Sequence, residues 1–150
     1  MFTELFKSIT YDSSIPIITQ EEMKLIIQKS LGTKLHQNAI VVLADAKYTT
    51  ISEYKISEIY MDSGLRNFQY REEVNDCDDA SLLFKSALVK SAGTDWKVKY
   101  PYAAGIVFGH IPTPHAINWF VTPEKRLKFL EPQSGETFNP KGDKIFFIFS

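Results

Sequence analysis

The chain has 150 residues, which is enough for one domain of ordinary size and leaves little room for two. Apolar residues make up 44% and charged residues 23%, so disorder, collagen-like sequence and a disulfide scaffold are excluded. The 17 Lys and Arg residues are matched by 18 Asp and Glu residues, so no basic surplus exists for general nucleic-acid binding. We therefore expect a single domain over residues 1–150 that does not bind nucleic acid.

No segment predicts a membrane span or a signal peptide. The longest stretch free of Asp, Glu, Lys and Arg runs from Tyr100 to Pro123, and its prolines argue against a spanning helix. The N-terminal segment carries Glu4 and Lys7 where a signal peptide needs an apolar core. The expected location is the cytoplasm by default, and secretion as part of a longer system is the alternative.

Two helices with capping signals are predicted in the first half of the chain. Thr19 to Glu22 forms a capping box ahead of apolar residues at helical spacing, and Gly32 would end that helix. Thr50 to Glu53 offers a second capping box, for a helix that stops at Gly64. Between them, the apolar run Ala39 to Leu43 predicts either a short buried strand or a helix turn.

The second half of the chain predicts one long helix followed by strands. The helix runs from about Cys77 to Ser91, is capped by Asn75 or Asp76, and is terminated by Ala92–Gly93. The segment Thr122–Lys125 predicts a hairpin loop. The predicted strands are Ala103 to Ile111, His115 to Val121, Arg126 to Leu130 and Ile145 to Phe149. Helices followed by an antiparallel sheet indicate the α+β class.

Cys77 is the only cysteine, so it cannot form an internal disulfide or a cysteine-based zinc site. A single cysteine among Ala and Leu residues is often a core residue. Cys77, however, lies at the predicted start of a helix, where free backbone N–H groups and the helix dipole favour a thiolate. A cysteine nucleophile also needs a base and a third group that orients the base.

The predicted hairpin supplies candidates for both groups. With its loop centred between Pro123 and Glu124, residues facing each other across the hairpin have numbers that sum to 247. His115 and Glu131 are then diagonal neighbours, or direct partners if the register shifts by one residue. The sequence therefore predicts a catalytic triad in which Cys77 is the nucleophile, His115 the base and Glu131 the orienting group.

A run of acidic residues surrounds the cysteine. Negative charge there would act against the helix dipole, so the carboxylates either cap the helix and face water or are neutralised by a cation. For the oxyanion hole, the backbone N–H of Cys77 is the simplest donor, and the side chain of Gln69 is a second candidate. The acidic residues are Glu72, Glu73, Asp76, Asp78 and Asp79.

Three segments resemble a known family. Asn75–Asp79, His115–Asn118 and Leu127–Gln133 are similar to the papain-like C-terminal domain of the fairy-ring mushroom agglutinin and its bacterial and viral relatives. The resemblance implies a papain-like fold with a Cys–His–Glu triad and a calcium-dependent cysteine protease. It also implies that Asp78 and Gln133, which adjoin triad positions, are calcium ligands.

A second resemblance competes with the first. The segment Cys77–Leu83, followed by His115–Ala116, is similar to the transglutaminase-like peptidases. That pattern usually has Asp where this chain has Glu131 and an aromatic residue where it has Ile117. Both families imply the same packing of a helix on a sheet, but they differ in the substrate implied.

The sequence thus predicts an α+β, papain-like fold with N-terminal helices and the nucleophile helix packed on an antiparallel sheet. The predicted activity is that of a cysteine hydrolase that cleaves peptide or related amide bonds in a peptide or protein substrate. The chemistry requires no cofactor, and Ca²⁺ is the one candidate ion. The alternatives are a catalytically inactive papain-like binding or effector module and a transglutaminase-like acyl transferase. The oligomeric state is left open.

Overall fold

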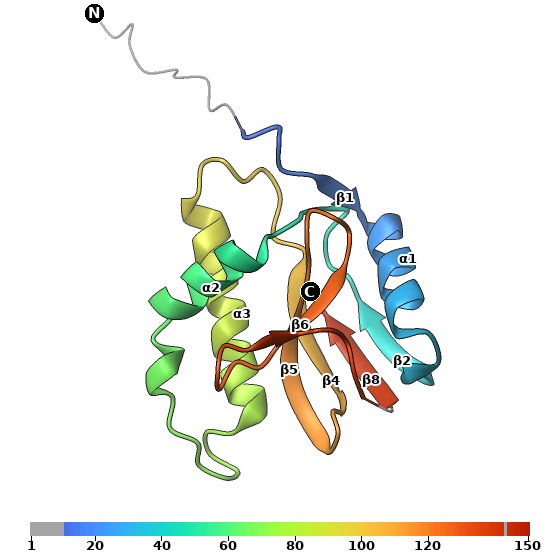
Figure 1. Ribbon diagram of the computed structural model, residues 1–150, viewed down its shortest axis with the longest axis vertical. Helices are drawn as coiled ribbons and strands as arrows, with labels where there is room; N and C mark the ends of the chain where they lie inside the picture. Colours follow the sequence, from blue (N-terminus) through green and yellow to red (C-terminus); the bar gives the residue numbers. More distant parts are fainter. Residues whose placement is uncertain (1–10, 143) are drawn as a thin grey trace, which may run out of the picture.

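The computed structural model describes residues 11–142 and 144–150 (Figure 1). The helices are α1 (Gln20–Leu31), α2 (Glu53–Asp62) and α3 (Cys77–Thr94), with the short 3-10 turns η1 (Gly32–Lys34) and η2 (Leu65–Asn67). The strands are β1 (Ile17–Thr19), β2 (Leu35–Val42), β3 (Lys47–Thr49), β4 (Ala104–His110), β5 (Pro114–Val121), β6 (Leu127–Leu130), β7 (Thr137–Phe138) and β8 (Lys144–Phe149). The predicted α+β class is confirmed.

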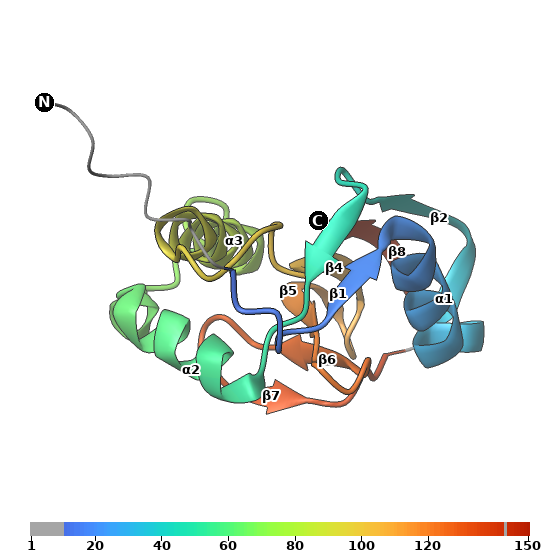
Figure 2. The same cartoon turned by 90° about the horizontal axis from the view of Figure 1, so that it is seen from above.

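A six-stranded sheet with the order β2-β8-β4-β5-β6-β7 forms the middle layer. Its neighbouring strands are antiparallel except β2 and β8, which are parallel. Helix α1 covers one face, and helices α2 and α3 cover the other (Figure 2). Strands β1 and β3 form a separate antiparallel pair.

Each face of the sheet has its own apolar core. On the α1 side, Met23 and Ile27 pack with Val107 and Phe129, and all four side chains are buried. On the other side, residues of α2 and α3 pack against Ala104, Phe120 and Leu130 of the sheet. Burial of apolar area on both faces is the main stabilising contribution in such an arrangement.

Of the two capping boxes predicted from the sequence, one is present and the other is not. The capping box at Thr19 is present as predicted: the Thr19 hydroxyl accepts from the Glu22 N–H at 3.1 Å, and the Glu22 carboxylate accepts from the Thr19 N–H at 2.8 Å. The box predicted at Thr50 is wrong, because the Thr50 hydroxyl donates to the Pro16 carbonyl at 2.9 Å. Ser52 caps α2 instead.

Two further expectations are corrected. The long helix does not stop at Ala92–Gly93 but continues to Thr94. In the run Ala39 to Leu43, the residues up to Val42 belong to a longer strand, β2, at the edge of the sheet, where Ile40 is 60% exposed, and Leu43 follows the strand. An apolar run alone does not distinguish a buried central strand from an edge strand.

Within the described residues, no helix combines the length and the apolar character that a membrane crossing requires. The single domain over residues 1–150 and the cytoplasmic location stay predictions.

Candidate functional site

The side chains of His115 and Glu131 form a short hydrogen bond across two neighbouring strands. His115 lies on β5, Glu131 follows β6, and His115 Nε2 is 2.6 Å from Glu131 Oε2. Each side chain is only 22% exposed. The other oxygen, Glu131 Oε1, accepts a hydrogen bond from the Gln133 backbone N–H at 3.1 Å. The structure therefore brings these two predicted site residues into direct contact.

The register of the hairpin differs by one from the predicted register. Asn118 faces Leu130, so facing residues have numbers that sum to 248 rather than 247. The reason is the loop, which closes with a hydrogen bond from the Thr122 N–H to the Arg126 carbonyl and holds Lys125 at a φ of 58°. A type I turn followed by a residue in the left-handed backbone conformation is typical of hairpin loops of three residues. His115 and Glu131 meet as diagonal neighbours on one face of the sheet.

Cys77 is the first residue of α3, and its side chain is partly buried. The helix is anchored on β5, because Asn118 Nδ2 donates to the Ser81 carbonyl at 3.0 Å. Cys77 therefore starts a helix that is fixed to the strand carrying His115. None of the hydrogen bonds in the described part of the chain joins the Cys77 thiol to His115. The structure thus pairs two members of the predicted triad by a direct bond and leaves the thiol outside that bond.

The acidic residues at the start of α3 form a tight cluster. One possible ligand atom from each of Asp76, Cys77 and Asp78 lies within 4.8 Å of the others. A side-chain hydrogen bond with Asp76, together with burial, raises the pKa of Asp78 above its ordinary value. Asp76 Oδ1 is buried and has no hydrogen-bond partner among residues 11–142 and 144–150. Gln133, the other predicted calcium ligand, follows β6, and its backbone N–H donates to Glu131 Oε1.

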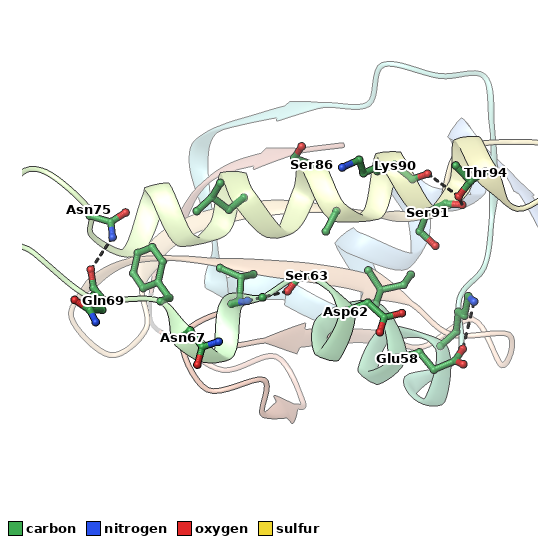
Figure 3. Close-up of a pocket in the computed structure, with 17 residues that line it drawn as sticks. Glu58, Asp62, Ser63, Asn67, Gln69, Asn75, Ser86, Lys90, Ser91 and Thr94 are labelled. Atoms are coloured by element: carbon green, nitrogen blue, oxygen red, sulfur yellow. Dashed lines mark hydrogen bonds and ion pairs between the residues drawn. The ribbon is translucent and has the colours of Figure 1, made fainter.

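A groove of about 880 Å³ lies between α2 and α3 (Figure 3). Sequence reasoning did not find it, because it forms only when two helices from separate parts of the chain pack side by side. Gln69, which was singled out as an oxyanion donor, lines this groove, and Cys77 does not. The polar lining residues are Lys55, Glu58, Asp62, Ser63, Asn67, Gln69, Asn75, Ser86, Lys90, Ser91 and Thr94.

The two ends of the groove differ in charge. Near the start of α3 the lining is neutral, and Asn75 Nδ2 donates to the Gln69 carbonyl at 2.6 Å (Figure 3). Near the end of α3 it is charged, and Lys55 pairs with Glu58 at 3.2 Å. Lys90 lies at this end, and no carboxylate in the described residues forms an ion pair with it. The groove follows α3 from Leu83 to Thr94, a stretch that corresponds to a length of about 18 Å.

Comparison with known families identifies the chain. The model of the agglutinin C-terminal family matches residues 48–137, which include α2, α3, the groove and the His115–Glu131 pair. The chain belongs to the agglutinin C-terminal family. A search of curated proteins found no match for this family member.

Two solved structures resemble this agglutinin-family chain. One is titled "PSL1a-E64 complex"; it is 26% identical with a TM-score of 0.78, and the match covers 89% of this chain and 51% of that one. The other is Polyporus squamosus lectin bound to the human-type influenza-binding epitope Neu5Aca2-6Galb1-4GlcNAc. It is 30% identical with a TM-score of 0.69, and the match covers 82% of this chain and 45% of the lectin. The chain therefore spans about half the length of the matched structures.

These matches contradict the predicted activity. The family is one of agglutinins, and a matched structure is a lectin with a bound saccharide, so the prediction of a cysteine hydrolase or peptidase is wrong. A peptide or protein substrate has no support either, whereas the alternative of a binding module agrees with the matches. No catalytic role is therefore assigned to Cys77, His115, Glu131 or Gln69.

Proposed function

We propose that this chain is a carbohydrate-binding module and that the groove between α2 and α3 is its ligand site. The observation that carries the proposal is a polar groove of about 880 Å³ in a member of an agglutinin family. Binding sites for small ligands are concave and combine apolar walls with a few fixed polar groups. The papain-like arrangement of α3 on the sheet stays a prediction.

The lining suits a ligand rich in hydroxyl groups. Each sugar hydroxyl both donates and accepts hydrogen bonds, and the amides of Asn67 and Gln69 offer both kinds of partner. The Asp62 carboxylate adds acceptors. The ring of Phe68, also in the lining, provides an apolar face on which the C–H face of a sugar ring can stack. A groove that follows about 18 Å of α3 accommodates several linked sugars rather than one.

At the charged end of the groove, which also carries the carboxylates of Glu58 and Asp62, Lys90 is the group that can bind an acidic sugar. Lys90 is exposed and has no ion-pair partner among the described residues, so its ammonium group can face a ligand carboxylate. The trisaccharide bound to the Polyporus lectin carries a sialic acid carboxylate at one end. The match covers only 45% of that lectin, so the trisaccharide is used here as a probe and is not assigned as the natural ligand of this chain.

Calorimetric titration with the trisaccharide and with the neutral disaccharide Gal-GlcNAc tests the proposal. Asn67→Ala and Asp62→Ala should each weaken binding of both ligands about tenfold, because each removes hydrogen bonds worth about 1–2 kcal/mol. Lys90→Met should weaken only the trisaccharide, about threefold, as expected for an exposed ion pair. Asn38→Ala, an exposed amide on β2 far from the groove lining, is the matched control and should change nothing.

Two outcomes would contradict the proposal in different ways. If neither saccharide binds at millimolar concentration, the carbohydrate-binding function is wrong for this chain. If both bind but the groove variants titrate like Asn38→Ala, the assignment to the groove is wrong.

We also propose that Ca²⁺ binds at the start of α3. The support is the cluster of Asp76 and Asp78, in which the buried Asp76 Oδ1 lacks a hydrogen-bond partner within the described part of the chain. Carboxylate oxygens are the ligands that Ca²⁺ prefers. The bound ion would neutralise the cluster and fix the N-terminus of α3, which forms one wall of the groove.

A further inference from the structure

A second cavity, of about 260 Å³, lies on another face of α3. It is formed by Lys85, Leu88, Val89 and neighbouring helix residues together with the segment Val98–Tyr102, which leads into β4. It shares no lining residue with the groove between α2 and α3. The two sites can therefore be altered independently.

Lys85 is the notable group in this cavity. Its ammonium Nζ donates to the Ala104 carbonyl at 3.0 Å, and no carboxylate in the described residues forms an ion pair with it. Burial lowers the pKa of Lys85, and Asp45 opposes this only as a longer-range charge. An ammonium group has three N–H donors, so two remain to be satisfied in a partly buried site. Such a group favours an anionic acceptor.

The rest of the lining complements an anion with an apolar body. Lys99 is a second cation in the lining, and its Nζ lies 5.6 Å from the centre of the Tyr100 ring. The walls are apolar, with Leu88, Val89 and Pro101 among them, and no lining residue is acidic. A water molecule takes about 30 Å³ in the liquid, so the cavity of about 260 Å³ has room for roughly nine non-hydrogen atoms.

We propose that this cavity binds a small monocarboxylate with an apolar body, whose carboxylate contacts the ammonium groups of Lys85 and Lys99. The apolar body packs against Leu88, Val89 and Pro101. This site is separate from the carbohydrate-binding function and does not depend on it. A purely structural Lys85, which only ties α3 to the Ala104 carbonyl, would show no preference for a charged ligand.

Octanoate, with ten non-hydrogen atoms, is the probe, and octanol is its neutral counterpart. Titration of the full chain should show octanoate binding at least tenfold tighter than octanol. Lys85→Met keeps the length of the side chain and removes its charge, so it should weaken octanoate at least tenfold. Lys90→Met, on the groove side of the same helix, is the matched control and should leave octanoate binding unchanged.

Circular dichroism gives an independent check of folding, since Lys85→Met should keep the spectrum of the parent protein. If Lys85→Met fails to fold, Lys99→Met takes its place and should weaken octanoate about threefold. The proposal is overturned if octanoate does not bind at millimolar concentration or if octanoate and octanol bind equally. It is also overturned if both lysine variants bind octanoate like the parent.

Discussion

Asp76 and Asp78 illustrate, at the scale of single residues, how a helix start can hold more negative charge than it needs. Carboxylates in a first helical turn stabilise it through the free N–H groups and the dipole. Asp79 already completes the capping box by accepting from the Asp76 N–H at 3.1 Å. Asp78 therefore adds charge beside a cap that is already formed, and the contact with Asp76 raises its pKa.

This pair predicts a calcium effect on stability. Because the pKa of Asp78 is raised in the folded state, folding favours its protonated form, and this favourable contribution is lost as the pH rises through the folded-state pKa. At neutral pH, Ca²⁺ can replace the missing proton. At ten times its Kd, a ligand stabilises a protein by about 1.4 kcal/mol, so Tm should rise by roughly 3–5 °C relative to chelator.

Asp78→Asn should abolish most of this shift, because it removes one of the two carboxylates. Glu72→Gln, in the same acidic run but outside the cluster, is the control and should keep the full shift. Magnesium should be weaker than calcium, since it requires a tighter octahedral shell. Equal Tm values in calcium and in chelator for the parent protein would contradict the calcium site.

At the scale of elements, α3 and β4 carry most of the molecule's organisation. Helix α3 borders the groove, the second cavity and the acidic cluster, and it packs on β5 and β4. Strand β4 lies in the centre of the sheet between β8 and β5. Two glycines in these elements, Gly93 and Gly105, differ sharply in their surroundings.

Gly105 and Gly93 therefore predict opposite effects of the same substitution. A Cβ at Gly105 would collide with the backbone of Phe149 on β8, so Gly105→Ala should cost about 3 kcal/mol or more. A Cβ at Gly93 meets nothing, and its backbone is helical, so Gly93→Ala should stabilise by about 0.4–1 kcal/mol. Urea unfolding measures both, and a destabilised Gly93→Ala protein would contradict the helical reading of that position.

Local signals explain which parts of the fold were predictable from the sequence. The capping box at Thr19 and the apolar runs of β4, β5, β6 and β8 depend on neighbours in the sequence, and they predicted the right elements. The exposure of Ile40 depends on the position of β2 at the sheet edge, which the sequence does not encode locally. Strands β1, β3 and β7 have three residues or fewer, too few for a periodic pattern.

The candidate site also has one part that could be predicted from the sequence and one part that could not. The contact of His115 with Glu131 was predictable, because one hairpin brings them together and only the register was off by one. The groove was not predictable, because it requires α2 and α3 to pack across the fourteen residues that separate them. Gln69 was predicted as an oxyanion donor because it lies near Cys77 in the sequence. Its observed position in the groove lining depends on the path of the loop before α3.

On the scale of the whole molecule, α2 is attached to the sheet through the turn that follows β6. Glu53 at the start of α2 accepts from the Thr137 hydroxyl at 2.8 Å and pairs with Lys128 at 3.4 Å. Any side chain at Gly135 would collide with the ring of Tyr60, so the turn lies directly against α2. The turn is itself fixed by Glu131, whose backbone carbonyl accepts from the Gly135 N–H at 2.7 Å.

We therefore expect the contact between His115 and Glu131 to affect the groove indirectly, because Glu131 bonds to the turn against which α2 packs. Glu131→Gln should lower the free energy of unfolding by about 1–2 kcal/mol, because a partly buried, charge-assisted hydrogen bond is weakened. Hydrogen exchange should speed up in α2 and leave α1, on the other face of the sheet, unchanged. Glu136→Gln, an exposed carboxylate in the same turn without a hydrogen bond in the described structure, is the control. The two variants could show equal rates of hydrogen exchange in α2. The contact between His115 and Glu131 would then stabilise only β5 and β6, and other contacts would hold α2 in place.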